Sequence, residues 1–208
     1  MNESNCHSRL PQGLVHLETR VTPDDKDTIV YYHLLKNTGR TLIFVNTIKN
    51  AKRLDGLLRA LGFNCRTIHA QLQQRQRLRA LDSFKAAPVG VLVATDVAAR
   101  GLDIPKIQFV LHYDVSRSPQ GYIHRSGRTA RAASSGESLS IISPDDVQYH
   151  RNICSTLETT KFTPLKPELS VLPNLRERIK AAKKMFTLSF IVSQKQKERS
   201  WIAQVQRK

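Results

Sequence analysis

The sequence predicts an α/β protein, built as a mainly parallel β-sheet flanked by helices and followed by a basic C-terminal extension. Short apolar runs alternate with helical patterns from about Leu14 to Leu157. The central runs are continuously apolar, which is typical of strands buried on both faces. Residues that start helices separate these runs, and crossover helices are the usual connection between parallel strands.

The strands are expected where apolar and β-branched residues cluster between turn residues. They are Leu42–Val45, Arg66–His69, Val89–Ala94, Ile107–Tyr113 and Leu139–Ile142. Apolar residues recur every three or four positions between Ile48 and Leu61, and again from Gln73 to Phe84. That periodicity predicts two helices, the first of which ends at a glycine.

Three further helix starts share a hydroxyl residue followed by proline. A hydroxyl can cap the first backbone N–H groups, and proline is favoured at the first helical position. They are Thr22-Pro23, Ser118-Pro119 and Ser143-Pro144, of which the first and the last continue into two aspartates. Acidic residues stabilise the positive end of a helix, so these segments predict helix N-termini.

The chain divides into three parts by composition. Residues 1–13 are polar and lack periodicity, which predicts a disordered lead-in, and residues 14–158 form the α/β domain. Residues 159–208 form the extension, expected to be partly helical or disordered. Lys161–Lys208 holds 12 Lys and Arg and 3 Glu, which supply 9 of the 16 net positive charges. A basic helix over Leu175–Met185 either projects or packs on the domain, and the sequence leaves both open.

The overall charge and the cysteines limit the class of protein. The chain contains 33 Lys and Arg and 17 Asp and Glu, which gives a net charge of +16. Such an excess favours a polyanionic partner such as nucleic acid, although a solvated basic surface explains it too. The three cysteines are widely spaced, so we expect neither disulfides nor a metal site. We find no secretory signal and no membrane span, and therefore expect an intracellular, soluble protein.

Polar residues follow several of the predicted strands directly. They are Asn46 and Thr47, His69, Thr95 and Asp96, and Asp114. Because the carboxyl ends of parallel strands meet at one edge of a sheet, these groups are expected to lie together. Hydroxyls, amides and backbone N–H groups at such an edge can bind a phosphate backbone. Thr47 and Thr95 serve equally well as helix caps, and His69 as a packed histidine.

Three arginines, Arg125, Arg128 and Arg131, recur at a spacing of three behind His124. A guanidinium is planar, permanently charged and bidentate, which suits it to phosphate. A series of this kind can also be a solvated helix face. With Gly127 inside the series and His124 before it, a phosphate site is the better interpretation.

The segment His124-Arg125-x-Gly127-Arg128-x-x-Arg131 resembles motif VI of superfamily 2 helicases. Ala94–Pro105 resembles motif V in its DEAD-box form, and Leu42–Thr47 resembles motif IV. Gln74-x-x-Arg77 resembles the Gln-x-x-Arg element of the same family, and His112-Tyr113-Asp114 resembles the segment before motif VI. The order and spacing of all five segments agree with the family. Residues 14–158 therefore resemble the C-terminal RecA-like domain of DEAD-box RNA helicases, which implies a three-layer RecA-like fold.

The resemblance implies roles for individual residues. Arg128 and Arg131 would be arginine fingers for the γ-phosphate of ATP, with Asp103 on the ribose. His124 and Arg125 would couple the interdomain cleft. The expected catalytic residues are therefore His124, Arg125, Arg128 and Arg131. The expected RNA-backbone residues are Asn46, Thr47, Gln74, Arg77, Thr95, Arg100 and Gly101. ATP with Mg²⁺ would be held by an N-terminal RecA-like partner domain, because the chain lacks a P-loop and an Asp-Glu-Ala-Asp segment.

Two functional interpretations follow from these absences. In the first, the chain is the C-terminal half of an ATP-dependent RNA helicase and is inactive in ATP hydrolysis by itself. In the second, it is a non-catalytic RNA-binding or competitor module. The segment around Gln74-x-x-Arg77 and the Pro144-Asp145-Asp146 segment resemble the nucleolar DEAD-box helicase twenty-four group, which acts in large ribosomal subunit assembly. That resemblance implies pre-ribosomal particles as partners and a nuclear, nucleolar location, with the cytoplasm as the alternative.

Overall fold

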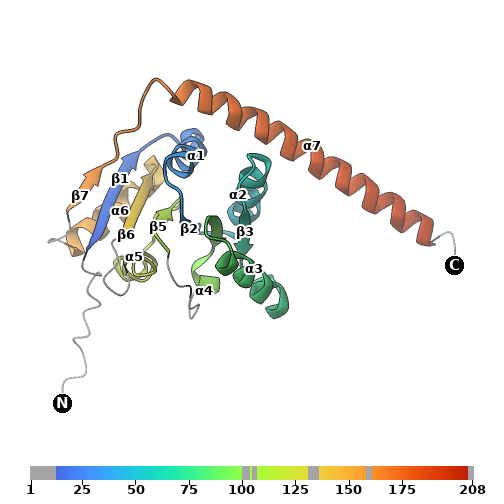
Figure 1. Ribbon diagram of the computed structural model, residues 1–208, viewed down its shortest axis with the longest axis horizontal. Coiled ribbons are helices and arrows are strands. Elements are labelled where there is room, and N and C mark those ends of the chain that lie inside the picture. The colour runs from blue at the N-terminus through green and yellow to red at the C-terminus, as the bar shows by residue number, and fades with distance from the viewer. Residues whose placement is uncertain (1–12, 100–103, 105–106, 131–135, 158–160, 206–208) are drawn as a thin grey trace, which may run out of the picture.

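The computed structural model describes residues 13–99, 104, 107–130, 136–157 and 161–205. Within them, seven strands form one sheet in the order β3-β4-β2-β5-β6-β1-β7, and every pairing is parallel. The strands are β1 Leu14–Arg20, β2 Arg40–Phe44, β3 Cys65–Ile68, β4 Gly90–Ala94, β5 Phe109–His112, β6 Gly136–Ile142 and β7 Phe162–Pro164. The expected parallel α/β sheet is therefore confirmed (Figure 1).

Helices cover both faces of the sheet, as the side chains of β2 show. Ile43 packs with α1, α2 and α7, whereas Leu42 and Phe44 pack with α3 on the opposite face. Successive strand residues point to opposite faces, so a continuously apolar strand buries both. The helices are α1 Lys26–Lys36, α2 Ile48–Ala60, α3 Gln74–Ala86, α4 Asp96–Ala99, α5 Pro119–Ser126, α6 Val147–Thr156 and α7 Leu172–Val205.

The three proline-led helix starts differ in detail. Ser118 caps α5 as expected, because its hydroxyl accepts a hydrogen bond from the Gly121 N–H at 3.1 Å. The other two segments form short 3₁₀ turns, Pro23–Asp25 and Pro144–Asp146, which lead into α1 and α6. Ser143 completes a capping box with Asp146, whereas Thr22 donates to the Asp25 carboxylate and makes no backbone cap.

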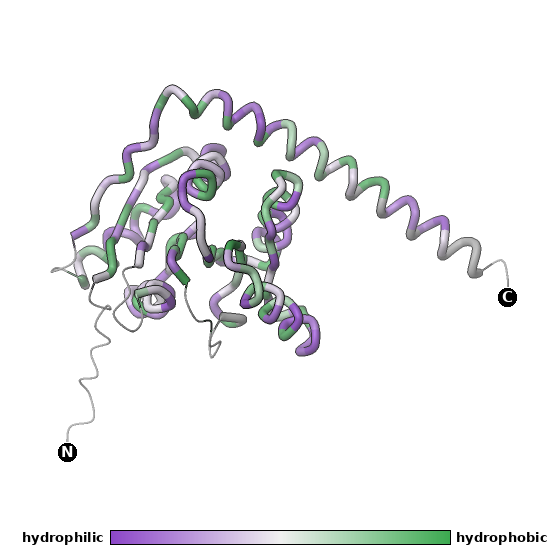
Figure 2. The backbone as a smooth tube through the Cα atoms, viewed as in Figure 1, coloured by the Kyte–Doolittle hydropathy of each residue, from purple (hydrophilic) through white to green (hydrophobic). Residues whose placement is uncertain are grey.

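The ordered fold continues past residue 158, where the sequence predicted the domain to end. β7 adds a strand beside β1, and the first turns of α7 bury Leu172, Leu175, Ile179 and Ala182 in the core shared with α1 and α2. The helix expected over Leu175–Met185 therefore forms and packs on the domain. It is also much longer than predicted, and its C-terminal half projects beyond α2 (Figures 1 and 2).

Ion pairs and one close contact hold α7 in place. Lys183 lies 2.8 Å from the buried carboxylate of Asp27, and Arg176 pairs with Asp25 at 2.7 Å. The ring of Phe186 lies directly over Gly56, where a β-carbon would come within 2.0 Å of it. None of the helices in the described residues combines the length and apolar character needed to cross a bilayer.

Candidate functional site at the carboxyl edge of the sheet

Arg125 joins the ends of three strands at the carboxyl edge of the sheet. Its guanidinium forms a bidentate pair with Asp96, which follows β4, at 2.6 and 2.8 Å. It also donates to the side-chain oxygen of Asn46 after β2, at 2.8 Å, and to the backbone oxygen of Asp114 after β5, at 2.7 Å. The ring of Phe44 lies beneath it, with the guanidinium carbon 5.1 Å from the ring centroid. The expected meeting of these loops is confirmed.

Burial determines what Arg125 can do. It is only 2% exposed, and its guanidinium is directed at protein acceptors. A group held in this way cannot reach a nucleotide phosphate without giving up several charge-assisted hydrogen bonds. The sequence placed Arg125 in the catalytic set as a residue that couples the interdomain cleft, and in this structure its hydrogen bonds are made within the domain. Arg125 positions the strand ends, and other residues present charge to a ligand.

A polar layer beneath α5 holds the motif helix on the sheet. The ring of His112 stacks on Tyr122 at 4.6 Å and lies within hydrogen-bond distance of the Ser126 and Ser138 hydroxyls. Tyr122 in turn contacts His16 Nδ1 at 2.7 Å. Complete burial holds the pKa of His112 well below its usual range, because burial disfavours the charged imidazolium. His112 is therefore a neutral part of the scaffold.

A pocket of about 380 Å³ lies in front of Arg125, and we call it the arginine pocket. The side chains that carry charge or can gain it are Asp96, Arg117, His124, Arg125 and Arg128. His124 is exposed at the end of α5 and lies 3.0 Å from the Gln120 amide nitrogen. Arg128 is half-buried at the wall. Among the described residues that line the pocket, cations outnumber the one carboxylate, which Arg125 already engages, so the pocket suits an anion.

The chain just after Arg128 has an unusual backbone. Ala130 has φ of +54°, in the left-handed region that side chains other than glycine seldom adopt. Ala130 directly precedes Arg131, which lies outside the described residues together with Arg100, Gly101 and Asp103.

The remaining expected RNA contacts lie at the same edge, with different degrees of exposure. Thr47 is exposed and caps α2, since its hydroxyl accepts from the Asn50 N–H at 3.1 Å. Asn46 donates from its side-chain amide to the Val115 oxygen, so both ends of that amide are engaged within the protein. Thr95 is 8% exposed. The amide of Asn46 is thus engaged within the protein, Thr95 is buried, and Thr47 has the capping role that the sequence left open.

The first turn of α3 presents the last two expected RNA contacts. Gln74 is exposed and Arg77 is half-buried, and a reciprocal capping box between Gln73 and Gln76 orders the turn. His69, just before this helix, is 2% exposed, which favours the packed histidine over a ligand contact. α3 therefore contributes Gln74 and Arg77 as side chains that a nucleic acid can reach.

The sequence did not predict the contacts of two residues at this edge of the sheet. Asp96 stands inside the segment that resembles motif V, but its pairing with Arg125 was not predicted. Lys26 is 5% exposed and donates to the Tyr113 oxygen at 2.9 Å and to Asp146 at 2.6 Å, beneath the same strand ends. A lysine at a helix start is normally solvated, so no local signal marks Lys26 as buried.

Comparison with known proteins agrees with this geometry. Residues 25–133, more than half of the chain, match the family model of the helicase conserved C-terminal domain. The chain is 46% identical to the ATP-dependent RNA helicase DDX24 of Mus musculus over 94% of its own length. It spans only 22% of the length of that relative.

Solved structures of DEAD-box proteins share the fold. Escherichia coli SrmB, bound to a regulator of ribonuclease activity, is 31% identical with a TM-score of 0.67, over 76% of this chain and 93% of the other. Saccharomyces cerevisiae Dbp5, bound to RNA and ADP BeF3, is 26% identical with a TM-score of 0.69, over 85% of this chain and 47% of the other. The chain therefore belongs to the helicase conserved C-terminal domain family, in its DEAD-box form.

Proposed function

We propose that this chain acts as the C-terminal half of an ATP-dependent RNA helicase. It supplies arginines to an ATP site completed by a P-loop-bearing RecA-like domain, and it forms part of the RNA-backbone path. The single observation that carries the proposal is the arginine pocket, in which Arg125 ties three strand ends together and leaves Arg128 and His124 at the wall. An anion site of that kind suits a nucleotide phosphate.

ATP with Mg²⁺ fits this pocket only as half of a site. Arg128 lines the pocket, and Arg131 and Asp103 are the further residues proposed to contact the γ-phosphate and the ribose. Positive charge from an arginine stabilises the negative charge that develops during phosphoryl transfer. Asp96, the one carboxylate among the described residues of the pocket, is paired with Arg125, so the described residues offer no cage for Mg²⁺. The partner domain is proposed to hold the metal.

The RNA path is proposed to run along the carboxyl edge beside the pocket. Gln74 and Arg77 on α3 and the exposed Thr47 on α2 can reach a backbone, and Arg100 and Gly101 are proposed to join them. Contacts to phosphate and sugar carry no sequence information, so recognition is expected to be independent of RNA sequence. The Dbp5 neighbour was solved with RNA and ADP BeF3, which supports this arrangement.

The test uses a protein in which this chain follows a P-loop-bearing RecA-like domain. Arg128→Gln and Arg131→Gln should each reduce RNA-stimulated ATP hydrolysis by roughly a thousandfold, as the loss of an arginine finger does. RNA affinity should change by less than about threefold, because neither guanidinium is proposed to contact RNA. Arg151→Gln, an exposed arginine on α6, is the matched control and should leave both unchanged. ATP hydrolysis that survives in both variants would contradict the half-site proposal and favour the non-catalytic RNA-binding module.

The projecting half of α7 is proposed to add sequence-independent affinity for RNA. Leu172–Phe186 is packed on the domain and its cations at 176 and 183 are paired, so truncation must begin after residue 186. Residues 187–208 contain five Lys and Arg and one Glu. Removing them should lower the slope of log affinity against log salt by about 0.7 for each RNA phosphate that these cations neutralise. An unchanged affinity and slope would assign the helix another role.

A role in large ribosomal subunit assembly, in the nucleolus, is proposed from the resemblance to the DEAD-box helicase twenty-four group and from the 46% identity to mouse DDX24. The expected result is nucleolar localisation of the full-length protein and co-sedimentation with pre-ribosomal particles. A diffuse cytoplasmic distribution, with no association with these particles, would contradict this part of the proposal.

A further inference from the structure

Three metal-ligating side chains converge outside the arginine pocket, between β1 and α6. Glu18 extends from β1, and His150 and Cys154 lie one turn apart on α6. Their donor atoms all lie within 4.8 Å of one another. Residues four positions apart share a helix face, which explains how the imidazole and the thiol come to face the same strand.

Two of the three donors already lie at the spacing of ligands of a small tetrahedral ion. His150 Nε2 lies 3.3 Å from Glu18 Oε2, and Cys154 Sγ lies 3.6 Å from Nδ1 and 3.9 Å from Nε2 of His150. Ordinary zinc–ligand bond lengths at a tetrahedral angle place nitrogen about 3.3 Å from oxygen and about 3.6 Å from sulfur. The nitrogen–oxygen pair already matches. The sulfur is almost equally far from the two ring nitrogens, so it lies against the imidazole, and the Cys154 side chain must rotate to bring it to the Nε2 lone pair. Zinc also accepts this mixture of carboxylate, imidazole and thiolate donors.

The central ligand is held firmly by its surroundings. His150 is 4% exposed, and its ring meets Phe162 of β7 edge-on at 5.2 Å. Burial lowers the pKa of His150, which leaves the imidazole neutral near pH 7, the form that binds metals. Burial raises the pKa of the Cys154 thiol, so binding must release its proton. Arg20 and Asp146 are the other charged groups that influence this histidine, and their effects are opposite in sign.

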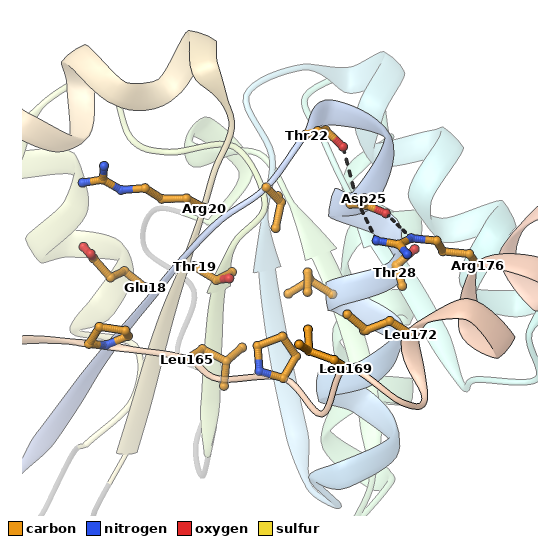
Figure 3. A pocket seen from close by; sticks show the side chains of 14 residues that line it. Glu18, Thr19, Arg20, Thr22, Asp25, Thr28, Leu165, Leu169, Leu172 and Arg176 are labelled. Carbon is orange, nitrogen blue, oxygen red and sulfur yellow. Dashed lines mark hydrogen bonds and ion pairs between the residues drawn. The ribbon is translucent and has the colours of Figure 1, made fainter.

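The cluster is open to solvent on one side. The Glu18 side chain is 20% exposed and borders a cavity of about 640 Å³ formed by the end of β1, the start of α1 and the segment that leads to α7. In Figure 3 the side chains of Glu18 and Arg20 project to the same side of β1. An ion can therefore enter from the Glu18 side, and of the three residues only His150 is buried.

We propose that Glu18, His150 and Cys154 bind one Zn²⁺ ion and that the ion ties β1 to α6. Three protein ligands leave the fourth position to water. The wide spacing of the cysteines led the sequence to predict no metal site. The fold brings together one cysteine, one histidine and a distant glutamate, a combination that sequence spacing does not reveal. Because the unfolded chain lacks this arrangement, Zn²⁺ is expected to stabilise the folded domain.

The test is a titration of the untagged 208-residue chain carrying Cys6→Ser, so that the N-terminal thiol cannot contribute. Co²⁺ should produce a thiolate-to-cobalt charge-transfer band that saturates at one equivalent, and Zn²⁺ should abolish it by displacement. Cys154→Ser should remove the band, and Glu18→Gln should weaken Zn²⁺ binding at least about tenfold, a loss of the size typical of altered metal sites. Cys65→Ala, a buried thiol in the core beneath α2, is the control and should retain the band.

Thermal unfolding supplies a second readout. Zn²⁺ should raise the melting temperature of the Cys6→Ser chain and leave that of the Glu18→Gln variant unchanged. Glu18 is partly exposed, so the Glu18→Gln variant should fold. It therefore tests Zn²⁺ binding even if the Cys154→Ser variant fails to fold. The proposal is overturned if no band forms, if Cys154→Ser retains the band, or if Zn²⁺ affinity and melting temperature are the same with and without the Glu18 carboxylate.

Discussion

Replacing Arg125 should destabilise the domain far more than replacing the neighbouring Arg128. Arg125→Ala removes the donors of the Asn46 side-chain oxygen and the Asp114 backbone oxygen, each held by a charged group. Such bonds contribute roughly 1.5–3 kcal/mol each. The Asp96 side chain is 40% exposed and can rehydrate, so its loss adds little. The expected cost to the free energy of unfolding is therefore roughly 3–6 kcal/mol.

Two further variants separate charge from geometry. Arg125→Lys keeps the charge and the aliphatic stem, but a point charge cannot replace a planar fork, so roughly 1.5–3 kcal/mol should still be lost. Arg128→Gln removes a half-buried cation at the pocket wall and should cost less than about 1 kcal/mol. Urea unfolding of the 208-residue chain, followed by circular dichroism, measures all three. If Arg125→Ala costs no more than Arg128→Gln, Arg125 does not organise the strand ends.

Three other predictions concern stability. Ala130→Gly should raise the free energy of unfolding by up to about 1 kcal/mol, because glycine removes the strain at φ +54°. Part of this gain is offset because glycine also raises the entropy of the unfolded chain. A clearly lower free energy of unfolding in urea would mean that this backbone is not strained. Gly56→Ala should lower the free energy of unfolding by roughly 1–3 kcal/mol, because the new methyl group clashes with Phe186. In a Phe186→Ala background only helix propensity remains, and the same substitution should raise the free energy of unfolding by about 1 kcal/mol. Equal effects in the two backgrounds would refute this docking of α7. Burial lowers the folded-state pKa of His16 to about 4, below its ordinary value of 6.5, so the unfolded state binds more protons between these two values. The free energy of unfolding should therefore fall as pH drops from about 6.5 toward 4.5, and urea midpoints measured against pH should show this fall. His16→Gln should give a shallower slope of midpoint against pH, and a slope equal to the parent's would exclude His16 as the linked group.

The order of the elements and the motif at the sheet edge were predictable from the sequence. Strands buried on both faces need continuous apolar runs such as Leu42–Val45, and helices need the 3.6-residue periodicity seen between Ile48 and Leu61. These signals are local, because they depend on neighbours in the chain. The convergence of Asn46 and Asp114 at one edge also followed from the sequence, since parallel strands place their carboxyl ends on the same side.

The roles of the side chains depended on distant partners. Arg125 and Arg128 look alike in the sequence, and their difference arises because α5 points the first at Asp96 and leaves the second at the pocket wall. The sequence alone likewise did not predict that β7 joins the sheet, and it left open whether α7 packs on the domain. Local propensity gives no account of burial by residues far along the chain.

The sequence by itself therefore determined the parallel α/β class, the family motifs and the edge at which the motif residues gather. Only the tertiary structure decided that Arg125 is a buried tie between strands, and that Glu18 lies beside His150 and Cys154. The physical reason is that periodicity and motif spacing are properties of neighbouring residues. Burial, pairing and metal-ligand geometry depend instead on which remote side chains the register of the sheet and the docking of the helices bring into the same small volume.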